Sequence, residues 1–399
     1  MDSKIKPSVL DLFAAPGGMS YGFKEAGYQI LGAVDNDRWG CETLQYNLGT
    51  DGTNVFSGNI ETLEVKGEVD VVIGGPPCQS FSRVGLPKIQ HLTKHNNRER
   101  LIDDKRNSLY RHFVRIVSHL KPQFIVMENV LGMLSFQNGN IKSQVIEGFH
   151  SIGYKSDMQI LNAADYGVPQ IRKRAFFIGN RVGLENPFPK RSHYDPRRTP
   201  QNSISEGQSE LKPYLTIFDA ISDLPSLEPG QGFDIAEYTP DISLTEYQHW
   251  ARTGAMRLQN HVARKHNQRD RDIFAILEPG QKMTDLPNSL RPYRSDIFKD
   301  KIKKQSWNRP SSAILAHMQK DGLMYVHPDR KQARSFTPRE AARLQSFHDR
   351  YVFKGPITQQ FKQIGNAVPP LLAEHVARIL RRFIVPLDNP YLEIRWATL

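Results

Sequence analysis

The sequence predicts an α/β protein with a doubly wound, mixed and mostly parallel sheet and a second, smaller domain. Between Ser8 and Ile178, short apolar runs typical of buried strands alternate with amphipathic stretches of helical length. After Gly179 this alternation stops, and Pro-, Ser- and Arg-rich sequence indicates a linker. The chain therefore has one regular α/β part and one part of a different kind.

Each expected element has its own pattern. The expected strands are the mostly apolar runs over Ser8–Phe13, Gln29–Val34, Asp70–Ile73, Gln123–Met127 and Ala175–Ile178. The expected helices between them carry apolar residues at helical spacing over Tyr21–Gly27, Arg38–Asn47, Asn107–His119 and Ile141–Ser151. Periodicity then stays poor to about Tyr325. Two further amphipathic helices are expected over Glu340–Phe347 and Leu371–Phe383.

A cysteine follows the strand Asp70–Ile73 in the loop Gly74-Gly75-Pro76-Pro77-Cys78-Gln79-Ser80-Phe81-Ser82. Adjacent prolines fix their own φ and push the preceding residues into extended conformations, so the loop is rigid. A rigid loop presents the Cys78 thiol in a defined direction. A lone cysteine near a strand end is also commonly a buried structural residue, so both interpretations remain open at this point.

Positive charge is concentrated in one segment. The formal net charge is +11, and residues 250–331 contain 17 Lys and Arg against 8 Asp and Glu. Residues 200–249 contain one Lys and nine acidic residues. A basic segment set apart in this way favours a polyanionic partner such as nucleic acid over an evenly solvated surface.

The sequence gives no sign of a membrane or secreted protein. No apolar stretch approaches the ~20 residues of a membrane span, and the first residues lack the apolar run of a signal peptide. We therefore expect an intracellular protein with no membrane association. In a reducing compartment Cys41 and Cys78 stay thiols.

Six segments occur in an order that resembles the cytosine-C5 DNA methyltransferases of the bacterial, restriction-modification type. They are Asp11–Gly18, Gly75–Gln79, Glu128–Val130, Gln170–Arg174, Thr337–Glu340 with Arg343–Gln345, and Gln363–Pro369. The resemblance covers roughly residues 8–180 and 333–382. It implies a Rossmann-like, S-adenosylmethionine-dependent fold with a catalytic and cofactor-binding domain (1–185 and 333–399) and a target-recognition domain (186–332).

The resemblance also implies a reaction: a methyl group passes from S-adenosylmethionine to C5 of a flipped-out cytosine in a specific double-stranded DNA sequence. In this reading Cys78 attacks C6, because C5 of cytosine is a poor nucleophile until a thiolate has added. Glu128 would act at N3, Arg172 near O2, and Arg174 would lower the pKa of Cys78. Taken alone, Glu128 also fits a strand-end cap, and the two arginines fit a surface salt-bridge pair.

The resemblance places the cofactor at the turn after the first strand, the usual nucleotide site of an open α/β sheet. Asp35 could accept hydrogen bonds from the ribose. Two residues depart from the family pattern: Ala15 stands where a glycine is usual, and Asn59 where an aspartate is usual. The expected cofactor contacts are Phe13, Ala14, Ala15, Gly17, Gly18, Asp35, Asn36, Asn59, Ile60, Pro76, Leu109, Asn366 and Val368, with no metal ion.

A cytosine inside a duplex cannot reach a thiol, so the resemblance implies base flipping. The long polar and basic stretch Arg83–Arg106 suits a lid that closes on DNA, although a solvated loop has the same composition. The expected DNA contacts are Ser80, Arg83, Gln170, Arg264, Arg269, Lys301, Lys303 and Lys304.

We expect a monomer in the bacterial cytoplasm, associated with the nucleoid and bound to double-stranded DNA. The resemblance also allows a cognate restriction endonuclease that acts on the same site without a stable complex. Two other functions stay open: a tRNA cytosine-5 methyltransferase on the same fold, and a catalytically silent DNA-binding regulator. The recognition sequence cannot be read from side-chain types alone.

Overall fold

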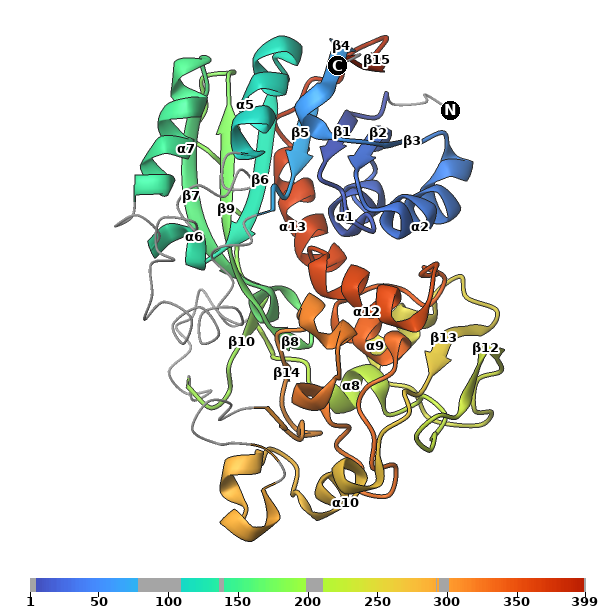
Figure 1. Ribbon diagram of the computed structural model, residues 1–399. Helices are drawn as coiled ribbons and strands as arrows, with labels where there is room; N and C mark the ends of the chain where they lie inside the picture. The colour runs from blue at the N-terminus through green and yellow to red at the C-terminus, as the bar shows by residue number, and fades with distance from the viewer. Residues whose placement is uncertain are drawn as a thin grey trace. The chain divides into compact units, whose positions relative to one another are not determined.

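A computed structural model describes residues 5–77, 109–135, 140–198, 211–291, 293 and 301–397. The chain divides into two compact units (Figure 1). The first unit contains residues 1–162, 173–190 and 372–399; the second contains residues 163–172 and 191–371.

The first unit is built on a seven-stranded sheet in the order β3-β2-β1-β5-β6-β9-β7. The strands β1, β2, β3, β5 and β6 are parallel to one another, whereas β9 is antiparallel to both β6 and β7. The mixed, mostly parallel sheet predicted from the sequence is thus confirmed. The bounds are β1 Ser8–Leu12, β2 Gln29–Asp35, β3 Asn54–Ser57, β5 Val71–Gly74, β6 Phe124–Val130, β7 Lys155–Asn162 and β9 Lys173–Asn180.

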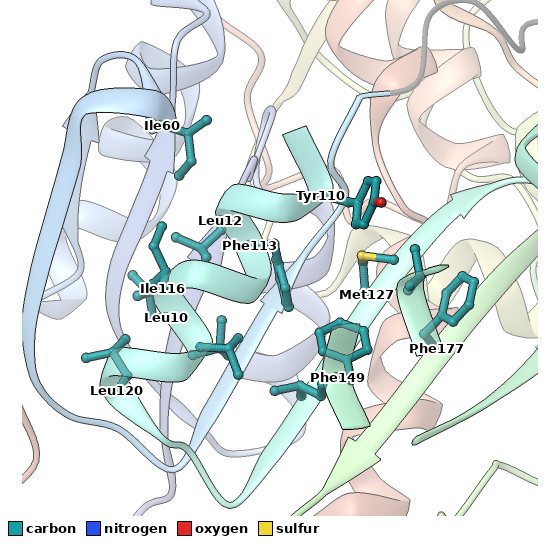
Figure 2. Close-up of a cluster of buried hydrophobic side chains, with 14 of the residues drawn as sticks. Leu10, Leu12, Ile60, Tyr110, Phe113, Ile116, Leu120, Met127, Phe149 and Phe177 are labelled. Carbon is teal, nitrogen blue, oxygen red and sulfur yellow. The ribbon is translucent and has the colours of Figure 1, made fainter. Parts of the chain in front are cut away.

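Side-chain alternation along β1 explains why helices cover both faces of this sheet. Leu10 and Leu12 join the apolar cluster formed with α5 and α7 (Figure 2). Asp11, between them in sequence, points to the opposite face, where it accepts a hydrogen bond from Ser20 of α1. All five residues of β1 are buried, as expected for a strand covered on both faces of the sheet. The helices of this unit are α1 Gly18–Glu25, α2 Arg38–Leu48, α5 Leu109–Leu120, α6 Gly132–Ser135, α7 Asn140–Ser151 and α13 Pro370–Leu380.

A buried carboxylate ties together distant parts of the first unit at the start of β5. Oδ2 of Asp70 accepts hydrogen bonds from the backbone N and the Oγ of Ser8, each at 2.7 Å. Its Oδ1 accepts from Gln123 Nε2 at 2.8 Å and from Leu387 N at 3.1 Å. One side chain thus joins the start of β1, the approach to β6 and the C-terminal segment.

A two-stranded antiparallel ribbon joins the C-terminal segment to the middle of the first unit. It pairs β15 (Tyr391–Trp396) with β4 (Leu63–Glu68), from Tyr391↔Glu68 to Trp396↔Leu63. Leu392 and Ile394 of β15 pack against the main apolar cluster. A short 3₁₀ turn, η2 (Ile60–Thr62), precedes β4, and another, η1 (Gly49–Asp51), follows α2.

The second unit has short elements and many loops. Its helices are α8 Ile217–Ile221, α9 Glu246–Arg252, α10 Gln268–Ile276, α11 Pro338–Leu344 and α12 Ile357–Asn366. Its strands are the parallel pairs β8 Gln170–Ile171 with β14 Ser311–Ser312 and β10 His193–Tyr194 with β11 Lys212–Pro213, and the antiparallel pair β12 Gly232–Ala236 with β13 Leu258–Val262. Short 3₁₀ turns complete it: η6 Ala163–Tyr166, η9 Met283–Asp285, η10 Asn288–Leu290, η11 Ala316–Gln319 and η12 Leu323–Tyr325.

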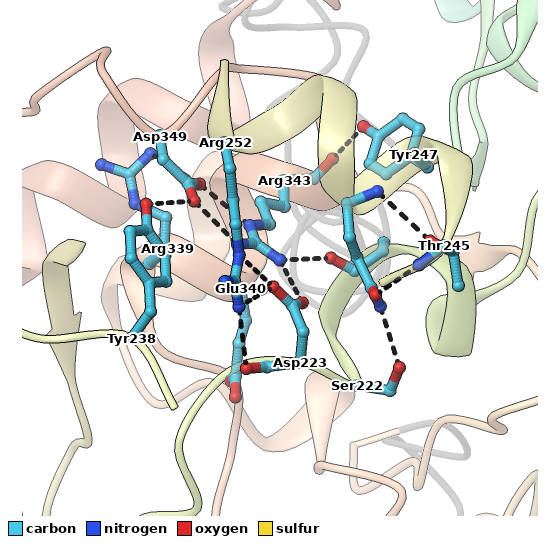
Figure 3. Close-up of polar contacts among 12 residues, drawn as sticks. Ser222, Asp223, Tyr238, Thr245, Tyr247, Arg252, Arg339, Glu340, Arg343 and Asp349 are labelled. Carbon is cyan, nitrogen blue, oxygen red and sulfur yellow. Dashed lines mark hydrogen bonds and ion pairs between the residues drawn. The ribbon is translucent and has the colours of Figure 1, made fainter. Parts of the chain in front are cut away.

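Buried ion pairs hold the core of this second unit (Figure 3). Arg343 of α11 is fully buried, and its guanidinium bonds Asp223 and both carboxylate oxygens of Asp349. In a second buried pair, Arg334 bonds both oxygens of Glu340 at 2.7 Å. Burial opposes ionisation of Glu340, but Arg334 outweighs it and holds the pKa of this carboxyl well below its usual range. The Thr337–Gln345 motif is therefore interior structure.

The expected elements of the first unit are confirmed, with ends that differ by a few residues. The strands β3, β4, β7 and β15 and the helices α8, α9, α10 and α12 were not anticipated. The contact-based units also differ from the expected domain limits, because residues 163–172 and 333–371 belong to the second unit. Which parts carry recognition and catalysis stays a prediction. Among the helices described, none has the length and apolar character needed to cross a bilayer.

Asp70→Ala should lower the stability of the protein by about 2–4 kcal/mol, because four donors lose a buried acceptor. Thermal unfolding followed by circular dichroism measures this loss. As a control, Glu185→Ala removes one side of the exposed pair with Lys155 and should change stability by less than about 1 kcal/mol. Similar effects of the two substitutions would contradict the anchoring role of Asp70.

Candidate active site

The parallel registers bring the ends of five strands into one row. Leu12 of β1 pairs with Val34 of β2 and with Gly74 of β5. The same row continues to Phe56 of β3 and to Met127 of β6. The next residues along these strands therefore form a second row at the carboxyl edge of the sheet: Ser57, Asp35, Phe13, Gly75 and Glu128.

The strand order reverses within this row. From β1 the chain proceeds through β2 to β3 on one side, and then returns to β5 and β6 on the other. In open α/β sheets, ligands bind beyond the carboxyl ends of the strands at such a switch point. Phe13 and Gly75 flank that position.

The turn after β1 is tight and contains left-handed residues. Phe13 has φ 61°, Ala15 φ 51° and Gly17 φ 87°. The backbone N of Gly17 donates to the carbonyl of Ala14 at 2.8 Å, and α1 begins at the next residue. Ala15 adopts a conformation that favours glycine, which explains why glycine is usual here. Gly40 is close by: a Cβ added there would lie 2.9 Å from the Ala15 carbonyl oxygen.

Asp35 at the end of β2 joins two turns. Its Oδ2 accepts from Ala15 N and its Oδ1 from Asp37 N, both at 2.7 Å. Burial raises the pKa of Asp35 above its ordinary value, and the two backbone donors oppose this shift. Each carboxylate oxygen has a second lone pair, so Asp35 can still accept from a ligand hydroxyl. Asn36, between these turns, is exposed.

The turn after β3 is held by its own polar groups. The side-chain oxygen of Asn59 accepts from Glu61 N at 3.1 Å and caps η2. Ile60 is buried, and its carbonyl accepts from Arg115 Nη2 at 3.0 Å. Asn59 itself is exposed beside this anchored turn.

The turn after β5 lies beside an acidic group. A Cβ added to Gly75 would be 3.5 Å from Glu128 Oε2, and Asn129 Nδ2 donates to the Pro76 carbonyl at 3.0 Å. Glu128 in turn pairs with Arg174, with 2.9 Å between Oε1 and Nε. Both side chains are 11% exposed. The chain segment leading to Cys78 thus starts next to a buried Glu–Arg pair.

Several predicted site residues cannot be located. Cys78, Ser80, Arg83 and the whole of the expected lid over Arg83–Arg106 lie outside the described residues. Pro76 is buried before this gap, and Leu109 begins α5 after it. Their roles stay predictions.

The two arginines of the Gln170–Arg174 segment have different surroundings. Arg172 is 2% exposed; its Nη1 donates to the Ile314 carbonyl at 2.6 Å, and its Nη2 to those of Gly365 and Ala367 at 3.0 Å. These partners all belong to the second unit. Arg172 therefore supports the backbone around Asn366, whereas Arg174 accompanies Glu128 in the first unit. The expected meeting of Asn366 and Val368 with the Phe13–Gly18 turn stays a prediction.

Some expected DNA contacts lie in the interior. Lys304 is fully buried and its Nζ donates to the Phe274 carbonyl at 2.8 Å; burial lowers its pKa to about 8. Gln170 is also fully buried, with hydrogen bonds to Leu344 and Ile314. These placements are incompatible with direct DNA contact in this conformation, and no local pattern in the sequence marked either residue as buried.

The other basic residues differ in accessibility. Arg264 donates to the carbonyls of Met318 and Gln319 at 3.1 Å, which occupies one end of its guanidinium. Arg269 is exposed, and Lys301 places its Nζ 3.7 Å from the centre of the Tyr293 ring. Lys303 is half-buried and donates to Ser312 Oγ at 2.8 Å.

The second cysteine is unsuited to nucleophilic attack. Cys41 of α2 is 7% exposed, and its thiol lies 3.5 Å from the Asp35 carbonyl oxygen. Burial raises the pKa of Cys41 to about 11, so the reactive thiolate form is scarce at neutral pH. Cys78 is therefore the cysteine to consider as a nucleophile.

A buried carboxylate beneath the cofactor turn fits a cationic ligand such as S-adenosylmethionine. Asp11 Oδ2 accepts from Ser20, and Oδ1 has no hydrogen-bond partner among the described residues. Burial raises the pKa of Asp11 to about 7. Nearby, the glycine-bearing turn allows close backbone approach. Within the ranges that the structure covers, no cluster of three or more His, Cys, Asp or Glu side chains could hold a metal ion.

The sheet edge and the buried Glu128–Arg174 pair place a candidate enzyme site at the topological switch point of an α/β fold. The family model of the C-5 cytosine-specific DNA methylases matches residues 8–382, and the chain belongs to this family. It is a DNA (cytosine-5-)-methyltransferase.

The relatives include bacterial Type II methyltransferases. M.DdeI of Desulfomicrobium norvegicum is 37% identical over 93% of this chain and 87% of its own length. M1.HphI of Haemophilus parahaemolyticus is 35% identical over 92% of this chain and 85% of its own. A solved DNA modification methyltransferase encoded within a prophage (E. coli) has a similar fold, with a TM-score of 0.67, 24% identity and coverage of 94% and 99% of the two chains.

The sequence analysis missed residues that support the site from behind. Asn129, Arg115 and Gly40 each fix the backbone of a site turn without being expected contacts. Asn129 lies within the Glu128–Val130 segment, so its membership of that motif could have indicated a supporting role. Nothing local in the sequence marks Arg115 or Gly40.

Ala15→Gly should raise the stability of the protein by up to about 1 kcal/mol. Glycine removes the strain of an alanine in the left-handed conformation, and this gain outweighs the greater conformational entropy that glycine adds to the unfolded chain. Ala14→Gly is the matched control: its φ is not positive, so it should destabilise the protein by about 1 kcal/mol. Thermal melts of both variants test this. Equal destabilisation would refute strain at Ala15.

Asp11 should make the protein less stable as pH rises from about 4 to about 7. Its folded-state pKa of about 7 exceeds the unfolded value of 3.8, so the folded protein binds more protons across this window. Asp11→Asn should remove this part of the pH dependence. Melting temperatures of both proteins measured from pH 4 to 8 test it, and an unchanged slope in Asp11→Asn would contradict the prediction.

Proposed function

We propose that this enzyme transfers a methyl group from S-adenosylmethionine to C5 of a flipped-out cytosine in a specific double-stranded DNA sequence, through a covalent Cys78 adduct at C6. The observation that carries the proposal is the row at the carboxyl edge of the sheet. That row contains the tight turn after β1, the ribose-binding candidate Asp35, the start of the Cys78 loop at Gly75, and Glu128.

The proposed chemistry needs a nucleophile and a group that handles the charge developing on the base. The Cys78 thiolate adds to C6, and the electron pair of the C5–C6 double bond becomes available at C5. S-adenosylmethionine supplies the methyl group that C5 receives. Loss of the C5 proton and expulsion of Cys78 then restore the double bond and release the product.

Glu128 is the candidate for the proton at N3. It is buried and lies beside Gly75, which is two residues before the Pro77-Cys78 pair. Because Arg174 pairs with Glu128 at 2.9 Å, we assign Arg174 to stabilise charge on the base at O2. Arg172 donates to three carbonyls in the second unit, so we revise its role to supporting the Gly365–Ala367 backbone.

The proposed cofactor contacts in the first unit keep the predicted residues. The Phe13–Gly18 turn would hold the amino-acid part, Asp35 the ribose hydroxyls, and Asn36, Asn59 and Ile60 the adenine. The exposed side chain of Asn59 and the unpartnered oxygen of Asp11 among the described residues support this arrangement.

DNA contacts are proposed for the basic side chains that remain accessible. Arg269 and Lys301 both lie against the Tyr293 ring, and Lys303 is half-exposed nearby in sequence. We further propose a monomeric cytoplasmic enzyme with recognition carried by residues 186–332. A restriction endonuclease acting on the same site fits the similarity to Type II methyltransferases.

The direct test is methyl transfer from labelled S-adenosylmethionine to duplex DNA and to tRNA. The proposal predicts labelling of duplex DNA only, and bisulfite sequencing of DNA from expressing cells should show protected cytosines in one sequence. Labelling of tRNA instead would support the tRNA methyltransferase. DNA binding without any transfer would support the silent regulator.

Glu128→Gln should reduce the rate of methyl transfer by roughly 10²-fold or more, within the range of general acid–base groups. The affinity for S-adenosylhomocysteine should barely change. Single-turnover kinetics and calorimetric titration provide the two measurements. Equal losses of rate and cofactor affinity would make Glu128 a structural residue instead.

Neutralising Lys301 and Lys303 together should weaken binding to all duplex sequences and lower the salt slope by up to about two. Lys304→Met is the matched control, because the buried Lys304 has no phosphate contact to lose. DNA titrations at several salt concentrations measure the slopes. A lower slope in the Lys304 variant alone would contradict these placements.

A further inference from the structure

The C-terminal strand β15 ends on the turn that follows β3. A Cβ added to Gly58 would lie 2.5–2.7 Å from three atoms of the Trp396 indole, so the ring rests directly against this glycine. The next residue continues the contact, because Ala397 N donates to the Thr62 carbonyl at 2.9 Å. Residues 396 and 397 thus border both ends of the Gly58–Thr62 turn.

The strand that carries Trp396 is firmly held. Its six residues pair with β4, and Leu392 and Ile394 pack on the apolar cluster beneath the sheet. A Cβ added to Gly32 of β2 would lie 3.4 Å from Leu392, which shows that β15 also reaches the central strands. The indole therefore projects from a fixed element rather than from a loose tail.

The turn is also fixed on its other sides. Gly58 N donates to the Asp35 carbonyl at 2.9 Å, and the Ile60 carbonyl accepts from Arg115 at 3.0 Å. Asn59 is exposed between these anchors. With Trp396 against Gly58, the backbone of Asn59 has little freedom to move.

We propose that Trp396 is a positioning residue for the cofactor: it fixes the Gly58–Asn59 turn in the place where this turn binds the adenine of S-adenosylmethionine. The inference rests on the proposed function for the identity of the ligand. Trp396 acts through Gly58 and does not take part in methyl transfer. It would therefore affect affinity for the cofactor and leave the chemical step alone.

Two features support a role beyond simple packing. Trp396 is 36% exposed as a residue, so it is not a core residue whose main contribution is apolar burial. Its position also requires a glycine at 58, because any larger residue would meet the ring. Because the position of the Gly58–Asn59 turn depends on the Trp396 ring, removing the ring should displace the turn. Small displacements of groups that contact a ligand are enough to change how well the ligand is held.

The test uses the full chain and S-adenosylhomocysteine as the probe. Trp396→Ala should raise the dissociation constant for this probe, and the KM for S-adenosylmethionine, about tenfold. The kcat at saturating cofactor should stay within about twofold of wild type, and Trp396→Phe should restore most of the affinity. Tyr391→Ala, at the far end of the same strand, is the control and should leave the dissociation constant unchanged.

A double-mutant cycle examines the contact itself. Gly58→Ala alone should weaken probe binding, since its methyl group displaces the turn from the ring. In the Trp396→Ala background the same substitution should cost much less, because the ring is gone. Additive effects would show that the two residues are not coupled and would overturn the proposal.

Other outcomes separate this proposal from the proposed function. Wild-type protein that fails to bind S-adenosylhomocysteine would refute the cofactor assignment. A lower melting temperature in Trp396→Ala with an unchanged dissociation constant would refute positioning and leave the cofactor assignment intact. If Trp396→Ala does not fold, the other two variants still test the proposal. It requires that Gly58→Ala weakens binding of S-adenosylhomocysteine and that Trp396→Phe does not.

Discussion

The register of β1 with its two neighbours is the constraint on which the site depends. Because Leu12 pairs with both Val34 and Gly74, the turns that follow three parallel strands must emerge side by side. Sliding β1 by one residue would also turn Leu10 and Leu12 away from the apolar cluster and expose Asp11 to it. The burial that fixes the fold therefore also fixes the alignment of the Phe13–Gly18 turn with Asp35 and, through the pairing of β5 with β6, with Glu128.

The second unit is stabilised in another way. Its core contains Arg334, Arg339 and Arg343, all fully buried and paired or hydrogen-bonded. Removing one partner from such a pair leaves an uncompensated charge, typically at a cost of about 3–5 kcal/mol. This network depends on residues far apart in sequence, such as Asp223 with Arg343. These buried pairs explain why the Thr337–Gln345 motif, although rich in charged residues, lies in the interior of the second unit.

The sequence predicted the regular part of the fold well because its signals are local. Apolar runs and helical spacing identified the central strands β1, β2, β5 and β6. Motif order pointed to Glu128 and the Phe13–Gly18 turn, which the strand registers bring to the same edge of the sheet, while their roles stay predictions. The half-exposed strand β7 and the C-terminal strand β15 lack an uninterrupted apolar run, so they were missed. Lys304 and Gln170 were misjudged because burial of a polar side chain depends on partners, here Phe274 and Ile314, that only the folded chain supplies.

The most direct test of the account is covalent trapping. Duplex DNA with 5-fluorocytosine at the methylated position should form a denaturant-stable complex with the protein in the presence of S-adenosylmethionine, because fluorine cannot leave as the C5 proton does. Mass spectrometry should locate the adduct on the peptide that contains Cys78, and Cys78→Ser should abolish it while Cys41→Ser preserves it. Methylation without any trapped complex, or an adduct on Cys41, would contradict the account.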